Sequence, residues 1–138
     1  YRASYEAVRK AATDFPSLNV TAAWWDNSWH VTVGARPLRA TLLQGEACGL
    51  TAEQPSEDEL RVLAASVRAL SYGTNLWGSA DYRRCISAPL AIQAVRRAAG
   101  IELSAALARE LEGVQIPKFA TDEYSCRRVP GVDSSEVR

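Results

Sequence analysis

The stretch from residue 18 to 33 constrains the fold most, because two β-prone runs flank a short polar turn. The runs read LNVTAAWW and WHVTV, and Asp26 and Asn27 lie between them. In the second run apolar and polar residues alternate, which places Trp29 and His30 on opposite faces of a strand. The pattern predicts a hairpin of two antiparallel strands with one buried face.

Other segments carry strand or helix signals. The run GARPLRATLL continues extended through Pro37 and predicts a third strand at a sheet edge. Ser56 and Glu59 stand in the capping-box relation, and Ser79 and Gly100 are suited to begin and end a longer helix. Helices are expected over residues 1–15, 57–70, 80–99 and 101–113, the third with a kink at Pro89.

The order of these segments predicts an α+β fold. A helix is followed by a three- to four-stranded antiparallel sheet and then by three helices that pack on one face of the sheet. The 138 residues suffice for one domain with its own core. We expect the domain to span residues 1–112. Residues 113–138 lose periodicity and predict a tail or docking arm.

Composition limits the classes of partner. Sixteen basic and sixteen acidic residues cancel, which argues against a nucleic-acid or anionic-membrane binder. Cys48, Cys85 and Cys126 are widely spaced without a CxxC pair, so free thiols and a cytoplasmic location are expected rather than a disulfide scaffold or structural zinc. No run is apolar and long enough for a membrane span.

Catalytic motifs are missing from the sequence. It has no glycine-rich phosphate loop, nucleophile elbow or HExxH motif, and no residue is predicted to act as a catalytic acid, base or nucleophile. The single histidine, His30, is expected on a strand face, exposed or hydrogen-bonded, and not in a catalytic role. The four tryptophans favour core or interface packing over stacking on a ligand. They are Trp24, Trp25, Trp29 and Trp77.

Tyr82 and Arg83 open the helix over residues 80–99 and raise a separate question. The helix dipole disfavours a cation in the first turn, so a carboxylate or a partner chain is expected to recruit Arg83 or its neighbour Arg84. A solvated helix face is the alternative. On the first interpretation Tyr82 and Arg83 stabilise the domain or an interface.

Several segments together resemble a known family. The segments YEAVRKAATDFPSLNVTAA, VTVGARPLRA and SADYRRCISAPLAIQAVRRAA occur in this order over about residues 1–100. They resemble the C-terminal domain of the FAD-binding (medium) subunit of the molybdenum hydroxylases, the group of xanthine dehydrogenase and carbon monoxide dehydrogenase. The chain departs from the family at Glu6 or Ala7, where a lysine near the flavin is common, and at Cys85, where a histidine often follows Tyr-Arg-Arg.

The resemblance implies a part in an oxidoreductase. FAD would pass electrons from iron-sulfur and molybdenum subunits to NAD or another acceptor, and an upstream domain would supply the glycine-rich loops that hold FAD. This chain would wall the flavin site and dock partner subunits, with Arg9 and Lys10 near the flavin edge, and would not bind FAD tightly alone. The alternative is a non-enzymatic protein–protein interaction module.

Overall fold

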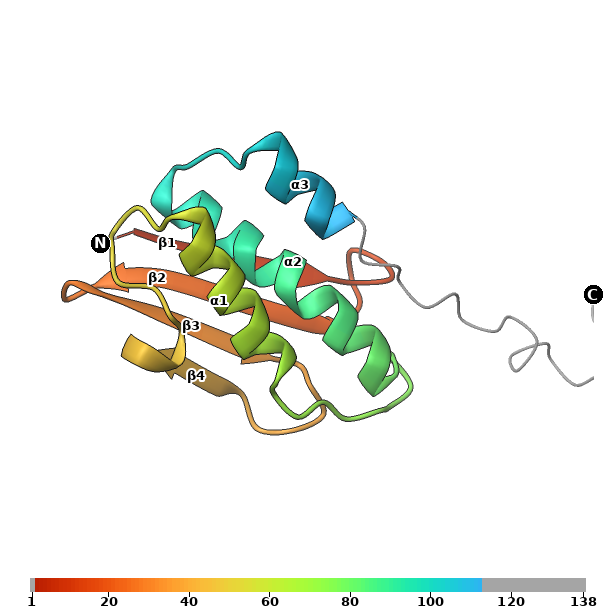
Figure 1. Ribbon diagram of the computed structural model, residues 1–138. Helices are drawn as coiled ribbons and strands as arrows, with labels where there is room; N and C mark the ends of the chain where they lie inside the picture. Colours follow the sequence, from red (N-terminus) through yellow and green to blue (C-terminus); the bar gives the residue numbers. More distant parts are fainter. Residues whose placement is uncertain (1, 113–138) are drawn as a thin grey trace, which may run out of the picture.

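The computed structural model describes residues 2–112, which form one antiparallel sheet and a helical layer (Figure 1). The strands lie side by side in the order β1-β2-β3-β4, and each neighbouring pair is antiparallel. The elements are β1 (Arg2–Val8), β2 (Leu18–Trp25), β3 (Ser28–Gly34), β4 (Thr41–Gln44), a 3-10 turn (Gly45–Ala47), α1 (Glu57–Arg68), α2 (Ala80–Ala99) and α3 (Ala105–Glu112).

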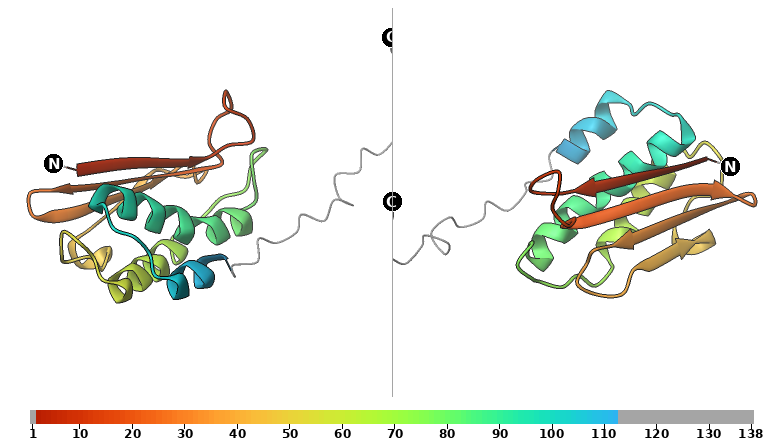
Figure 2. Two further views of the ribbon diagram at one scale, coloured as in Figure 1. Left: turned by 90° about the horizontal axis from the view of Figure 1, so that it is seen from above. Right: turned by 180° about the vertical axis from the view of Figure 1, so that it is seen from behind.

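All three helices lie on the same side of the sheet (Figure 2). The core forms between them and the inward residues of the strands, and its side chains are almost fully buried. Burying one aliphatic side chain of this kind contributes about 1.5–3 kcal/mol. The α+β class with helices on one sheet face is therefore confirmed. Central core residues include Val20, Val31, Val33, Leu63, Val67, Ile92 and Val95.

The hairpin of β2 and β3 is confirmed. Asp26 and Asn27 have φ angles of 52° and 53°, as a two-residue turn matched to the twist of the strands requires. Trp24 pairs with Trp29, and their rings are 5.6 Å apart. Trp29 is fully buried and its indole N–H donates to the carbonyl of Ala52 at 2.8 Å. The prediction of core packing is thus confirmed for Trp29.

The prediction of a helix over residues 1–15 is wrong, because residues 2–8 form strand β1. Seven residue pairs join β1 to β2. Three of the four inward residues of β1, Arg2, Ser4 and Glu6, are polar, so the alternation is hidden in the sequence. Ser4 donates to the carbonyl of Ala94 in α2 at 2.5 Å, and Glu6 accepts from Arg97 at 2.7 Å. Tertiary contacts decide the conformation here over local periodicity.

The later helices begin at capping residues. The capping box of Ser56 and Glu59 is confirmed at α1, and α2 runs from its cap Ser79 to Gly100, which has a φ of 71°. The last helix begins later than expected, at Ala105. The hydroxyl of Ser104, the residue before it, accepts a hydrogen bond from the Leu107 amide. Pro89 lies inside α2, which continues as one helix to Ala99. The segment 113–138 lies outside the described residues.

Two further observations concern the described residues alone. Cys48 and Cys85 are free thiols there, and Cys126 lies outside them. Within residues 2–112, no helix is sufficiently long and apolar to cross a bilayer.

Glu59 yields a pH-dependent prediction. Burial raises the pKa of Glu59, but hydrogen bonds from Thr51 and Ser56 outweigh burial and lower its pKa from 4.5 to about 2. A lowered pKa stabilises the fold above the ordinary pKa, and this contribution is lost as the pH falls from 4.5 to about 2. At pH 7, Glu59→Gln should therefore lower the free energy of unfolding by about 1 kcal/mol, the usual value of a cap.

Urea denaturation of both proteins across pH measures this difference. It should be constant at neutral pH and shrink towards zero as the pH approaches 2. A difference independent of pH would contradict the assignment of the stabilisation to the Glu59 carboxylate.

Candidate functional site

Three connections meet at one end of the sheet, and we call this region the loop end. They are residues 9–17 between β1 and β2, residues 35–40 between β3 and β4, and residues 69–79 between α1 and α2. Figure 1 shows them gathered around the first turn of α2.

Arg83 is the buried centre of the loop end. Its side chain is 0% exposed, and burial lowers its pKa. The guanidinium donates to all three connections. The acceptors are the carbonyls of Ser17 (2.7 Å), Ala35 (3.2 Å), Gly73 (2.8 Å) and Gly78, and Oδ1 of Asn75 (2.6 Å).

The prediction that a carboxylate binds Arg83 is therefore wrong for the described residues, because the acceptors of Arg83 are carbonyl and amide oxygens. Arginine presents five N–H donors in a fixed fork and stays charged, so several backbone dipoles can replace water around it. The solvated-face alternative is also wrong for Arg83. It does fit the neighbouring Arg84, whose exposed side chain pairs with Asp81 at 3.1 Å.

A second buried arginine, Arg36, strengthens the same region. It is 6% exposed and donates to the carbonyls of Ser71 and Arg39 and to the hydroxyl of Thr41. Its own carbonyl accepts the Gly73 amide at 2.8 Å. The β3–β4 and α1–α2 connections are thus joined by both side-chain and backbone hydrogen bonds.

Apolar side chains cover the solvent side of the loop end. Phe15, Leu76 and Leu38 are 76%, 82% and 51% exposed. The Phe15 ring meets Trp77 edge-on at 6.4 Å, and both line an open depression together with Asn75. Exposed apolar clusters of this kind mark binding or docking surfaces.

Arg9 lies at the rim of this apolar surface. Its guanidinium donates to the Tyr5 hydroxyl and to the Asp14 carbonyl, both at 3.2 Å, and Asp14 precedes Phe15. Lys10 follows in the same connection and is exposed. The half-buried Tyr82 ring packs against the core beside Arg83. The site residues predicted from the sequence, Arg9, Lys10, Tyr82 and Arg83, therefore lie in or beside the loop end. The exposed apolar residues there were not predicted as site residues. They are Phe15, Leu38 and Leu76.

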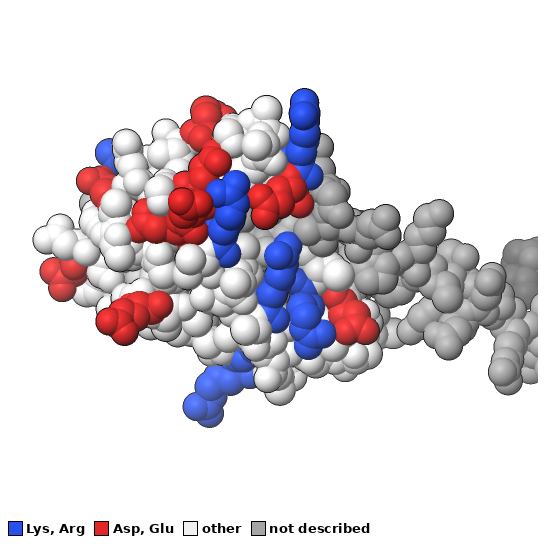
Figure 3. All heavy atoms as spheres, in the orientation of Figure 1, with Lys and Arg blue, Asp and Glu red and all other residues white. Residues whose placement is uncertain are grey.

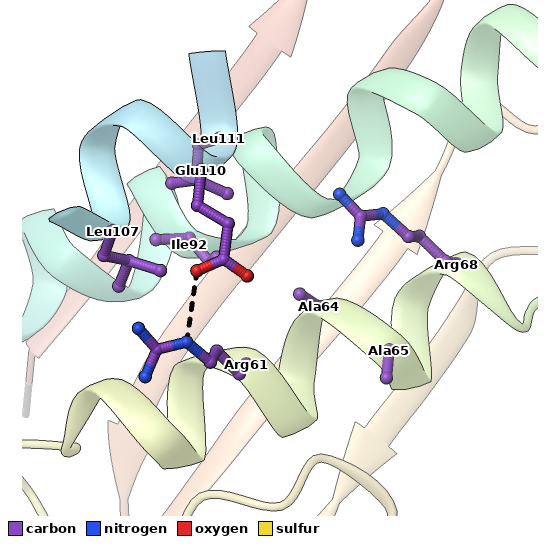
Figure 4. Close-up of a pocket in the computed structure, with 8 residues that line it drawn as sticks. All are labelled: Arg61, Ala64, Ala65, Arg68, Ile92, Leu107, Glu110 and Leu111. Atoms are coloured by element: carbon purple, nitrogen blue, oxygen red, sulfur yellow. Dashed lines mark hydrogen bonds and ion pairs between the residues drawn. The ribbon is translucent and has the colours of Figure 1, made fainter. Parts of the chain in front are cut away.

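A different cavity lies between α1 and α3 (Figure 4). Ile92 and Leu107 form apolar walls, and Arg61 donates to Glu110 at 3.2 Å across the opening. Arg61 also pairs with Asp58 at 2.9 Å. Acidic and basic side chains are mixed on this helical side (Figure 3). The ion pairs are mutually satisfied, and the loop end remains the stronger candidate.

Groups that could act in catalysis are sparse around the loop end. His30 lies outside it, on β3, where its ring is 5.8 Å from Trp25. Across residues 2–112, no group of three or more His, Cys, Asp or Glu side chains is arranged to hold a metal ion. The arrangement at the loop end suits contact with an apolar or planar surface and places a cation at its rim.

Comparison with known proteins bears on the fold. No family model matches the sequence, and no curated protein is a significant match to it. Among solved structures, the crystal structure of quinoline 2-oxidoreductase from Pseudomonas putida 86 is similar, with a TM-score of 0.59 and 15% sequence identity. The similarity covers 72% of this chain and 37% of that chain, so the matched region is a minor part of the other protein. At this identity the two share a fold.

Arg83 gives a direct stability test. Arg83→Met retains an unbranched side chain of similar length but leaves five oxygens without their donor, and each unsatisfied buried polar group is costly. The free energy of unfolding should fall by about 3 kcal/mol or more. Arg84→Met, its exposed neighbour, should change it by less than about 1 kcal/mol.

Chemical denaturation of both variants measures these values, with far-UV circular dichroism as the check on folding. Equal, small losses for the two substitutions would contradict the bracing function assigned to Arg83.

Proposed function

We propose that this chain is the C-terminal domain of a flavoprotein subunit in a molybdenum hydroxylase. In this role, FAD is held mainly by an upstream domain, and the loop end walls one side of the flavin. The intact enzyme passes electrons from iron-sulfur and molybdenum subunits through FAD to NAD or another acceptor, and this chain helps to dock those subunits.

Two independent lines support the proposal. The sequence resembles this family over about residues 1–100. The fold is similar to part of quinoline 2-oxidoreductase, an enzyme named for the oxidation or reduction of a nitrogen heterocycle. The observation that carries the proposal is the braced loop end, where apolar residues and the cation of Arg9 lie together.

The chemistry of this surface suits a flavin wall. Phe15 and Trp77 offer apolar contact to a planar ring, and their exclusion of water would strengthen nearby electrostatic interactions. A cation at the rim favours reduced, anionic flavin, and Arg9 lies there. FAD itself supplies the hydride and electron transfer, while the protein supplies position and field.

The exposed side chains also favour a second function, that of a protein–protein interaction module without a flavin. Leu76 is 82% exposed, and an apolar loop tip of this kind can insert into a partner. The coding sequence before Tyr1 discriminates between the two functions. Glycine-rich loops encoded there support the flavoprotein, and a start codon directly at this position supports the module.

Titration with FAD tests where the dinucleotide is held. Tight binding needs several backbone amides that converge on the pyrophosphate, usually from a glycine-rich loop at a helix N-terminus. Gly73 and Gly78 at the loop end instead turn their carbonyls towards Arg83. The 138-residue chain, followed by flavin fluorescence, should therefore not bind FAD at submicromolar concentration. Submicromolar binding would place the dinucleotide site within this chain and contradict the proposal.

The wall itself can be tested in the FAD-loaded protein that contains this chain. Arg9→Ala should lower the flavin reduction potential, because the reduced anion loses a nearby cation. Arg61→Ala, which removes an exposed arginine on the helical side, is the matched control and should leave the potential unchanged. Equal potentials for all three proteins would refute flavin contact at the Arg9 rim.

A further inference from the structure

The sheet has a second face that no described helix covers, and we call it the open face (Figure 2). The register of the strands defines its residues. They are the odd-numbered residues of β1 and β2 and the even-numbered residues of β3 and β4, because the alternate positions Ala22, Val31 and Leu43 point into the core. None of the open-face residues is Asp, Glu, Lys or Arg.

An uncharged sheet face is unusual for a chain in which 23% of residues are charged. The solvated face of a one-sided antiparallel sheet normally alternates polar residues with the buried ones. On the open face, Tyr5, Trp25 and Leu42 are instead 51%, 62% and 52% exposed. The helical side, by contrast, carries both acidic and basic side chains (Figure 3). Uncharged surfaces with exposed aromatic residues indicate an interface.

His30 adds a second observation at the centre of the open face. It lies on an inner strand, beside the ring of Trp25 at 5.8 Å. The Trp25 and His30 rings thus place an aromatic pair on the open face, and aromatic side chains are enriched at interfaces.

We propose that the open face binds a second copy of this chain, with the two sheets packed face to face. The two-fold axis would run parallel to the strands, between β2 and β3. Such an axis places β1 of one copy over β4 of the other. Tyr5, Thr21, Thr32 and Leu42 form one row across the sheet, so Tyr5 meets Leu42 of the partner subunit.

The side chains on the two strands nearest the axis, β2 and β3, are complementary in size. Trp25 pairs in register with Ser28, and Ala23 pairs with His30. The two-fold rotation therefore sets Trp25 against Ser28 of the partner subunit, and His30 against Ala23 of the partner subunit. A large side chain meets a small one in each case. A two-fold interface requires this kind of self-complementary surface.

The size of the face is at the lower limit for a specific dimer. Strands β1, β2 and β3 are 7 to 8 residues long and β4 has 4 residues. With strands about 4.8 Å apart, the open face covers roughly 400 Å² in projection. Two such faces, with the added area of their side chains, bury on the order of 1,000 Å² in total, which is the lower range for specific interfaces. Opposed open faces bring no like charges together, so no electrostatic repulsion offsets this burial.

This inference does not rest on the proposed flavoprotein function, because the open face is formed by strand residues and the loop end by the connections, with the hydrogen bond from Arg9 to the Tyr5 hydroxyl as a contact between them. Sedimentation velocity of the 138-residue chain tests it. A reversible dimer is expected, and a chain that stays monomeric up to about 100 μM, a concentration at which a micromolar dimer would be formed, would overturn the inference.

Matched variants show which face associates. Leu42→Lys places a charge in the open face and should weaken the dimer by about 100-fold or more. Val62→Lys is the control, because Val62 on α1 has an almost equal exposure of 51%. It should leave the dimer intact. Circular dichroism confirms that both variants are folded. Equal association of the folded Leu42→Lys variant and the unmodified chain would also overturn the inference.

Cross-linking tests the axis. In a chain whose native cysteines are replaced by alanine, the double variant Tyr5→Cys, Leu42→Cys should form covalent dimers with a short thiol cross-linker. Each single variant should not, since identical positions would be about three strand spacings, roughly 14 Å, apart. Cross-linked dimers from the single variants alone would contradict the proposed arrangement.

Discussion

One buried cation organises the end of this domain where its loops meet. Arg83 donates to four carbonyls and one amide oxygen from three connections. Each of those oxygens would otherwise need water or a strained turn of its own, because a buried carbonyl without a donor is destabilising. Ala35, with a φ of 57°, is held in the left-handed region next to this network. A single side chain from α2 thus fixes the conformation of segments far apart in the sequence.

The rigidity of the loops explains how apolar side chains can stay at the surface. Hydrogen bonds from Arg83 and Arg36 fix the connections that carry three exposed apolar side chains, so these side chains do not turn into the core. They are Phe15, Leu38 and Leu76. A preorganised surface loses little conformational entropy when it binds. This property suits a flavin wall and a docking surface equally, and the cation of Arg9 at the rim favours the former.

Much of the fold could be predicted from local signals. The turn at Asp26 and Asn27 and the caps at Ser56 and Ser79 depend on neighbouring residues, and all three are as expected. Strand β1 could not be predicted, because its inward polar residues Ser4 and Glu6 bind to α2, about 90 residues away in sequence. The partners of Arg83 could not be predicted either, because every residue has a backbone carbonyl and the sequence does not show which of them accept a hydrogen bond from Arg83. Its position in a first helical turn did signal that something recruits it.

Hydrogen exchange tests the bracing by Arg83 most directly. The amides of Gly73 and Gly78 donate to the carbonyls of Arg36 and Asn75 inside the loop end. In Arg83→Lys, which keeps the charge but loses the fork, these amides should exchange at least about tenfold faster. The amides of the β2–β3 hairpin should keep their rates. Unchanged exchange at Gly73 and Gly78 would contradict the account, because the loops would then hold their conformation without Arg83.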